Sequence, residues 1–171
     1  DFGTTSLKAA LVDRAGRILA HASESYPLVQ PEVGWVEQDP ERLWSAAAGA
    51  GGRALQQAGV SRERVGAVIF VAPWKGIIPV SADGETLGDA IIWMDSRATA
   101  EAEALNARAG EFVGTGQEYW PRLMWLKHRR PEVWAASRWL MGLTTYLKWK
   151  ATGVVVTEPS DDFIRSERPS L

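Results

Sequence analysis

The sequence contains no cysteine and only two histidines, His21 and His128, among its 171 residues. A chain without cysteine has no disulfide framework and no thiolate metal site, and two isolated histidines do not form a zinc cluster by themselves. No apolar run approaches the roughly 20 residues that a helix needs to cross a bilayer, and no signal peptide is recognisable. We therefore expect neither a disulfide scaffold nor a membrane protein, and the cytoplasm is the default location.

A marked excess of charge of either sign is also missing. The chain has 19 basic and 21 acidic side chains, which gives a formal net charge of -2. Such a balance provides no general attraction for polyanions, and the basic residues are scattered apart from the run 127–130. Nucleic acid is therefore not an expected partner. The content of 46% hydrophobic and 23% charged residues is that of a globular protein with one hydrophobic core.

The apolar residues follow patterns that predict strands and helices in alternation, which is typical of an α/β domain. The expected strands are 7–13 and 18–25, which form a hairpin, a buried run 65–72, and the short segments 76–80, 90–94 and 139–143. The expected helices are 40–58, 96–109, a helix around Leu123 that ends near Pro131, and 144–153. The polar tail from Glu158 to Leu171 is expected to be a boundary or loosely ordered.

The first eight residues carry the strongest chemical signal. A glycine and three small hydroxyl residues follow one another in the turn before the first expected strand: Gly3, Thr4, Thr5 and Ser6. Such a turn offers backbone N–H groups and hydroxyls that can surround phosphate oxygens. The alternative is a polar β-turn without a ligand, because glycine, threonine and serine are common turn residues.

Two charged residues flank this turn. Asp1 stands at its head, where a carboxylate can hold hydrated Mg²⁺ beside phosphates, since this hard cation prefers carboxylate and water oxygens. Lys8 projects from the following strand and adds positive charge near the same place. With these flanking charges, the opening has the residue types that a phosphate and Mg²⁺ site requires.

Several strings, in this order, give the chain a family resemblance. Asp-Phe-Gly-Thr-Thr-Ser, followed by a basic residue and a strand ending in Asp13, resembles the first phosphate-binding hairpin of FGGY carbohydrate kinases, within the actin-like ATPase superfamily. The further matches are 34–40 with Trp44 (G-W-x-E-Q-x-P…W), 91–98 (I-x-W-x-D-x-R), 123–127 with 131–133 (L-x-W-L-K…P-E), and 146–160 (Y-x-x-x-x-x-T-G…S). Together they cover nearly the whole chain, which therefore resembles the N-terminal domain of a xylulose kinase-like member.

The resemblance implies a fold and a distribution of the sugar and ATP sites between two halves of the enzyme. It implies one ribonuclease H-like domain over 1–171, with a mixed five-stranded sheet flanked by helices. Kinases of this family place the sugar on the N-terminal side of a cleft and ATP mainly on the C-terminal side. Their general base and adenosine-binding glycines lie in the C-terminal half, so no catalytic residue is expected here and the chain alone is expected to be inactive. The opening motif normally follows a strand, so a first strand is expected to be missing.

The implied ligands are ATP, Mg²⁺ and a sugar or polyol. Gly3, Thr4, Thr5, Ser6 and Lys8 would contact the ATP phosphates, while Asp1 would hold the metal ion. The sequence does not name the sugar. A homodimer through the exposed inner face of a half-enzyme is an open alternative.

Five residues are candidates for the sugar side. Trp74 and Lys75 occupy the place where other family members carry S-G-Q-M-H-G or a substrate-binding arginine and glutamate; the alternatives are packing for the tryptophan and a solvated charge for the lysine. Asp95 and Arg97 could bind sugar hydroxyls or bind each other, and Asp95 could also cap a helix. Tyr119, with Gln117 nearby, lies in the segment 110–123, which is shorter than in other members.

Two other classes of function remain open. A non-catalytic sugar or nucleotide sensor on the same fold would account for the departures at Trp74 and Lys75 and for the missing half. An actin-like or chaperone-type ATPase shares the phosphate turn, but it has no reason to carry the elements around Trp93 and Trp125. We therefore rank the kinase first and the ATPase last.

Overall fold

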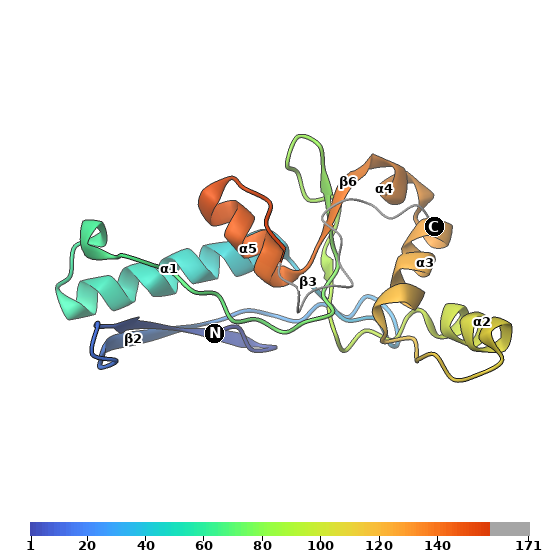
Figure 1. The fold of residues 1–171 in the computed structure, drawn as a ribbon, viewed down its shortest axis with the longest axis horizontal. Helices are drawn as coiled ribbons and strands as arrows, with labels where there is room; N and C mark the ends of the chain where they lie inside the picture. The colour runs from blue at the N-terminus through green and yellow to red at the C-terminus, as the bar shows by residue number, and fades with distance from the viewer. Residues whose placement is uncertain (158–171) are drawn as a thin grey trace. The chain divides into compact units, whose positions relative to one another are not determined.

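The computed structural model describes residues 1–157, so the predicted boundary in the tail lies outside the described residues. The chain divides into two compact units, which we call the hairpin unit (1–28 and 41–73) and the core unit (29–40 and from 74 onward). Figure 1 shows the elements in chain order. They are β1 (Ser6–Val12), β2 (Ile18–Ser25), β3 (Glu37–Gln38), α1 (Pro40–Ala58), the short 3-10 helix η1 (Arg62–Arg64), β4 (Ile78–Ser81), β5 (Ala90–Ile91), α2 (Thr99–Ala109), α3 (Tyr119–Arg129), α4 (Pro131–Ala136), β6 (Ser137–Met141) and α5 (Leu143–Thr152).

The hairpin predicted from the first 25 residues is confirmed. Strands β1 and β2 pair antiparallel from Ser6 opposite Ser25, with a register shift between Leu11 and Val12. The turn is closed by Asp13, whose carboxylate accepts hydrogen bonds from the backbone N–H groups of Ala15 and Arg17 at 2.9 and 3.0 Å. These bonds and the Arg17 side chain hold the pKa of Asp13 below its usual value.

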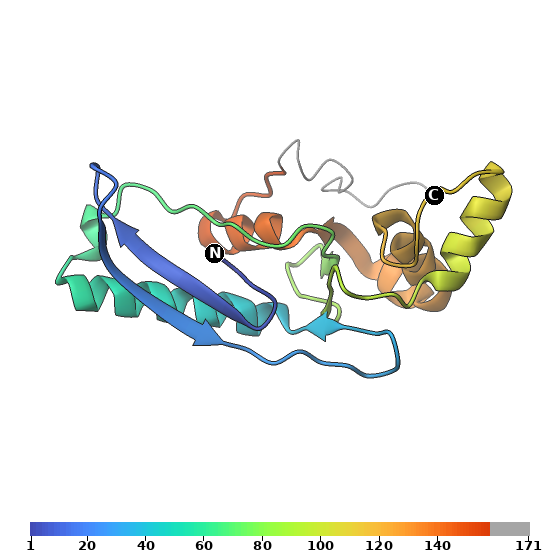
Figure 2. The same ribbon diagram turned by 90° about the horizontal axis from the view of Figure 1, so that it is seen from below.

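Helix α1 runs along the hairpin, as Figures 1 and 2 show from two sides. The prediction of a helix from 40 to 58 is confirmed, because small and apolar residues recur at helical spacing and are buried: Leu43, Ala46, Ala50 and Ala54. On the exposed side, Arg53 donates to the Ser23 carbonyl at 2.9 Å and pairs with the Glu24 carboxylate. The helix and the hairpin therefore form one layered body.

The predicted buried strand 65–72 is wrong in this structure. The segment is extended but belongs to none of the strands, and Val68, Ile69 and Val71 are exposed. An apolar groove of about 820 Å³ separates it from β1, and helix α1 contributes to the groove's lining. The segment has β-strand sequence character, but its backbone meets the N-terminal residues at one hydrogen bond, from the Phe2 N–H to the Val71 carbonyl, and no ladder forms. Its lining residues include Leu7, Leu11, Ala54, Leu55, Val65 and Ile69.

The core unit contains two further strand pairs. Strand β3 pairs antiparallel with β5, and β4 pairs antiparallel with β6, with Ile78 opposite Met141. A single bridge between Ile77 and Ile91 adjoins both pairs. The described residues thus form three two-stranded sheets. Within residues 1–157 these pairs are not joined into one continuous five-stranded sheet.

Helices α2 to α4 and strands β4 to β6 enclose the hydrophobic core of this unit. The predicted helices are present, although the one expected from Ser96 begins at Thr99. Their apolar faces meet the strands in one cluster of buried side chains: Ile77, Ile91, Ala98, Tyr119, Leu123, Trp125, Leu126, Val133 and Leu140. No helix among residues 1–157 is long and apolar enough to cross a membrane.

Candidate functional site

The hydroxyl-rich turn is held tightly at the start of the hairpin. The Gly3 N–H donates to the Ser6 carbonyl at 2.8 Å, and a Cβ on residue 3 would come within 3.0 Å of that same oxygen. The close approach explains why glycine stands at this position. The turn is therefore a fixed arrangement of a glycine and three hydroxyl side chains.

Tyr26 holds this turn in place through two hydrogen bonds, a role that the sequence motifs did not indicate. Its buried hydroxyl donates to the Gly3 carbonyl at 2.7 Å, and its backbone N–H donates to the Thr5 carbonyl at 3.0 Å. Burial raises the pKa of Tyr26 to about 12, so the phenol stays protonated and remains a donor at neutral pH. A lone tyrosine after a strand gave no signal, because the contact depends on the hairpin bringing residues 23 positions apart together.

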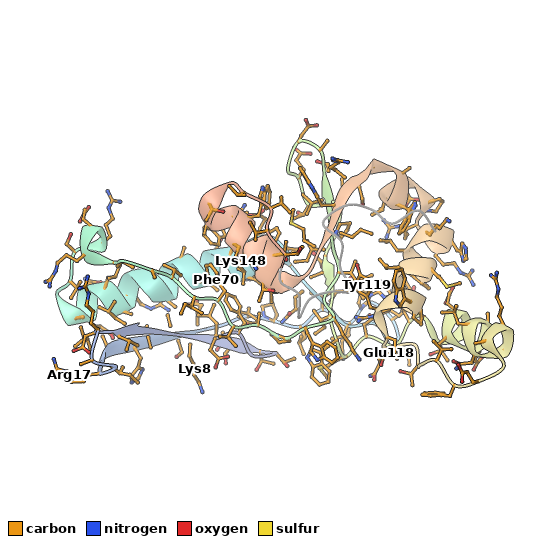
Figure 3. All side chains as sticks on the ribbon, viewed as in Figure 1. Lys8, Arg17, Phe70, Glu118, Tyr119 and Lys148 are labelled. Atoms are coloured by element: carbon orange, nitrogen blue, oxygen red, sulfur yellow. The ribbon has the colours of Figure 1, made fainter. Side chains whose placement is uncertain are left out.

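Asp1 and Lys8 lie side by side at the ends of the turn. The amino group of Asp1 donates to the Lys8 carbonyl at 3.0 Å, and the Lys8 backbone N–H donates to the Asp1 carbonyl at 2.8 Å. Both residues are exposed, and Figure 3 shows the Lys8 side chain pointing away from the hairpin. The structure thus places Asp1 and Lys8 at the two ends of the hydroxyl-rich turn and joins them through their main chains.

This donor set fits Mg²⁺ that is held mainly by phosphates and water. Mg²⁺ usually keeps several waters and takes one or two carboxylates plus substrate phosphates. Asp1 offers one exposed carboxylate, and residues 1–157 contain no cluster of three or more metal-binding side chains. Asp1 is therefore suited to a metal ion that arrives with its phosphates, not to a permanent protein cage.

In the core unit, Asp95 and Arg97 bind each other. The Arg97 guanidinium donates to both carboxylate oxygens of Asp95, at 2.9 and 2.7 Å, and to Glu37 at 2.7 Å. The Asp95 carboxylate also accepts the Val36 N–H at 2.6 Å. This is the second of the two arrangements considered for the pair, and it ties the Glu37 strand to the Asp95 turn. Because its carboxylate is engaged here, Asp95 does not cap α2.

Two tryptophans enclose the Arg97 guanidinium. Its central carbon lies 4.0 Å from the ring centre of Trp35 and 4.8 Å from that of Trp125, and the two rings meet edge to face. The Arg97 side chain is 2% exposed. Stacking on aromatic faces suits the weakly hydrated guanidinium and adds to the ion pairs. Tryptophans from two motifs of the sequence therefore serve packing around a buried ion cluster.

Trp74 and Lys75 form a more open group. The Lys75 ammonium lies 4.4 Å from the ring centre of Trp74, whose side chain is exposed, and donates to Glu118 at 2.8 Å. The backbone φ of Lys75 is 61°, in the left-handed region that side-chain-bearing residues rarely adopt. Such a conformation costs about 1–3 kcal/mol and persists only where surrounding contacts enforce it. This segment therefore combines an exposed tryptophan and a half-buried lysine with a constrained backbone.

Tyr119 lies in the hydrophobic core, 4% exposed. Its ring packs edge to face on Trp120 at 5.9 Å, and burial raises the pKa of its hydroxyl. In the same segment, Gln117 donates to the Met94 carbonyl at 3.3 Å. Gly116 is so close to the Thr99 backbone that a Cβ would come within 2.7 Å of its nitrogen. The short 110–123 segment is thus packed directly against the turn that precedes α2.

Arg122 is a polar residue of this region that the motifs missed. Its side chain is fully buried and donates to the carbonyls of Lys75 at 2.5 Å and Ile92 at 2.6 Å. Burial lowers the pKa of Arg122 to about 10, which leaves it charged at neutral pH. The sequence signal that could have identified Arg122 is its place among apolar residues of the helix, because a buried arginine rarely lacks hydrogen-bond partners.

Comparison with known proteins identifies relatives along nearly the whole chain. The family model described as "FGGY family of carbohydrate kinases, N-terminal domain" matches residues 1–162. Xylulose kinase of Bacillus subtilis (strain 168) is 27% identical over 169 residues, covering 94% of this chain and 34% of that protein. Xylulose kinase of Staphylococcus xylosus is 30% identical over 169 residues, covering 94% and 35%.

Solved structures give the same result. Xylulose kinase from Rhodospirillum rubrum superposes with a TM-score of 0.82 at 28% identity, over 91% of this chain and 34% of that chain. Gluconate kinase from Lactobacillus acidophilus superposes with a TM-score of 0.82 at 26% identity, over 90% and 32%. The chain spans about a third of the length of the relatives it matches.

Proposed function

Because the chain belongs to the FGGY family of carbohydrate kinases and has its α/β, ribonuclease H-like fold, we propose that it supplies the sugar-side domain of an enzyme that phosphorylates a sugar or polyol hydroxyl with ATP. The observation that carries the proposal is the ordered turn from Gly3 to Ser6 between Asp1 and Lys8. Turn and family point to the same reaction class, phosphotransfer to an alcohol.

The turn would act on the phosphates. Its backbone N–H groups, the hydroxyls of Thr4, Thr5 and Ser6, and the Lys8 ammonium would surround phosphate oxygens and stabilise charge on the transferring group. ATP would supply the phosphoryl group, and Mg²⁺ beside Asp1 would neutralise part of its charge. Tyr26 would keep the turn rigid through its bond to the Gly3 carbonyl. None of these residues would activate the acceptor hydroxyl.

Trp74 and Lys75 are the proposed direct contacts of the sugar. Exposed aromatic faces pack against the C–H surface of sugars, and an ammonium donates to hydroxyl or carboxylate oxygens. Asp95 and Arg97 would act through the backbone that they hold, because their charged groups already bind each other and Glu37. Tyr119 would contribute by packing beneath the same region.

The remaining catalytic parts are proposed to lie outside this chain. In the relatives named above, about two thirds of the chain lies outside the part that matches this protein. We place the general base and the nucleotide pocket in that remainder, where they would close on the sugar and exclude water. The chain alone is therefore expected to show no useful turnover.

The apolar groove supports a further point of domain organisation, a missing strand ahead of Asp1. Asp1 is bonded to Lys8 on one side, and the Phe2 N–H donates to the Val71 carbonyl at 2.7 Å on the other. An extended segment continuing from Asp1 would run antiparallel to β1 and parallel to 65–71, with its next residue opposite Ala9. Five or six residues at about 3.3 Å each would fill the groove.

This strand can be tested by fusing the protein's own upstream residues to Asp1. We expect the extended chain to have a free energy of unfolding at least about 2 kcal/mol higher than that of the chain beginning at Asp1, because apolar area is buried and a ladder is completed. The matched control carries proline at the middle of the added segment, where it cannot donate to the ladder. Equal stability in urea denaturation of the chain beginning at Asp1, the extended chain and the proline-containing extended chain would refute the strand.

The function is tested on the full-length protein by coupled ADP release with Mg²⁺-ATP and a panel of ketoses, polyols and sugar acids. We expect turnover on one of them and a loss of about 10²- to 10³-fold in kcat for Asp1→Ala. Asp13→Asn, at the far end of the same hairpin, is the matched control and should retain activity. Absence of turnover on every sugar, with binding of sugar or nucleotide still measurable by calorimetry, would favour a non-catalytic sensor instead.

A further inference from the structure

Arg122 joins parts of the core unit that are far apart in sequence. Its guanidinium donates to the carbonyls of Lys75 at 2.5 Å and Ile92 at 2.6 Å, and to its own helix at the Glu118 carbonyl at 3.2 Å. No ion pair found among residues 1–157 includes Arg122. The Asp95 and Glu118 charges lie near enough to favour its charged form, but its hydrogen bonds all go to carbonyls, and such a buried charge is costly beside an apolar residue of similar volume. Its presence needs a reason beyond packing.

One arm of the guanidinium holds the backbone of the Trp74–Lys75 segment. Lys75 has the left-handed φ of 61°, and its carbonyl is the acceptor of the 2.5 Å bond from Arg122. The Lys75 ammonium in turn pairs with the Glu118 carboxylate at 2.8 Å. Arg122 therefore binds the backbone of both members of this ion pair, next to a residue whose conformation persists only where surrounding contacts enforce it.

The other arm holds the turn that leads to Asp95. The Ile92 carbonyl accepts one bond from Arg122 and a second from the Asp95 N–H at 3.0 Å. Asp95 and Arg97 then follow directly, with their own buried ion pairs. The planar fork of arginine reaches two carbonyls from separate nitrogens at a fixed spacing, whereas the donors of a lysine ammonium all lie on one nitrogen.

We propose that Arg122 is a positioning residue for sugar recognition, which sets the Lys75 backbone and the Ile92–Asp95 turn at a fixed separation. It does so from beneath the surface, with one arm on each segment. The inference rests on the proposed function only for its expected effect on sugar binding. The coupling between the two segments is a property of this chain and is measurable without any substrate.

The first test measures hydrogen–deuterium exchange in the full-length protein. Arg122→Lys should raise the exchange of peptides covering 74–77 and 92–97 at least tenfold, while a peptide covering β6 (137–141) changes less than twofold. Leu126→Ala, a buried core residue on the same helix that touches neither carbonyl bond, is the matched control and should lack this selectivity. Arg122→Gln replaces the lysine variant if the latter does not fold. Unchanged exchange, or a uniform rise across all peptides, overturns the proposal.

The second test separates this inference from the function itself. If the wild-type protein turns over a sugar, Arg122→Lys should raise the KM for that sugar at least tenfold and leave the KM for ATP within twofold. Leu126→Ala should leave both within about twofold. Equal changes in the two variants, or in the two KM values, would contradict a positioning role. A wild-type protein without turnover refutes the kinase proposal, while the exchange result still decides the role of Arg122.

Discussion

The hairpin unit and the core unit differ in how far their ion pairs and their apolar surface are buried. In the core unit, Arg97 and Asp95 are buried with ion-pair partners and aromatic faces around them. In the hairpin unit, the pair Arg53 and Glu24 is 43% and 40% exposed, while an apolar groove of about 820 Å³ stays open. The core unit therefore satisfies its buried charges with its own residues, whereas the hairpin unit leaves its charges exposed and an apolar groove open.

The largest expected effect comes from breaking the buried cluster. Asp95→Asn should lower the free energy of unfolding by about 3–5 kcal/mol, because Arg97 loses its bidentate partner and stays buried. The exposed pair of the hairpin unit is the comparison: Glu24→Gln should cost less than about 1 kcal/mol. Urea denaturation measures both. Similar costs for the two variants would contradict the difference between the units.

The next effect compares leucines in the two units. Leu123→Ala should cost about 2–5 kcal/mol, because this fully buried side chain leaves a cavity in the closed core. Leu55→Ala should cost about 1 kcal/mol, since Leu55 lines the open groove and is only partly buried. The same denaturation assay applies. Should Leu55→Ala be as costly as Leu123→Ala, the groove would not be open in solution.

A smaller effect is expected at the constrained backbone of Lys75. Lys75→Gly should be more stable than Lys75→Ala by about 1 kcal/mol, because both variants lose the side-chain contacts but only alanine keeps the penalty of a left-handed φ. Thermal unfolding of the two variants gives the difference directly. A more stable alanine variant would show that residue 75 is not left-handed in solution.

The smallest effect concerns Asp89, beside strand β5. Burial, followed by the nearby Asp39 charge, raises the pKa of Asp89 above its usual value of 3.8. Ionising this carboxyl therefore opposes folding, so its penalty is absent below pH 3.8, grows as the pH rises, and is complete above the folded-state pKa. Asp89→Asn should add less than about 1 kcal/mol at pH 7 and nothing at pH 3. An equal gain at both pH values would exclude an electrostatic origin.

Local patterns in the sequence were enough to predict the hairpin, helix α1 and the position of the hydroxyl-rich turn. In each case the signal lies within a few residues: strand-like runs on either side of the tight turn 14–17, helical spacing from Leu43 to Ala54, and the run from Gly3 to Ser6. The segment 65–72 shows the limit of such patterns. Its composition is that of a strand, but a strand also needs a partner, and composition carries no information on whether that partner is present.

Sequence alone is enough to infer the family, the order of most elements and the residues of the turn, because ordered motifs and short-range periodicity are visible in a linear string. The partners of the polar residues, in contrast, depend on the folded arrangement. Arg97 meets Glu37 across 60 positions, and Arg122 meets Lys75 across 47. Contacts over such separations depend on how packed elements bring distant backbone together, and a buried charge takes whichever acceptors the folded core places within hydrogen-bonding distance.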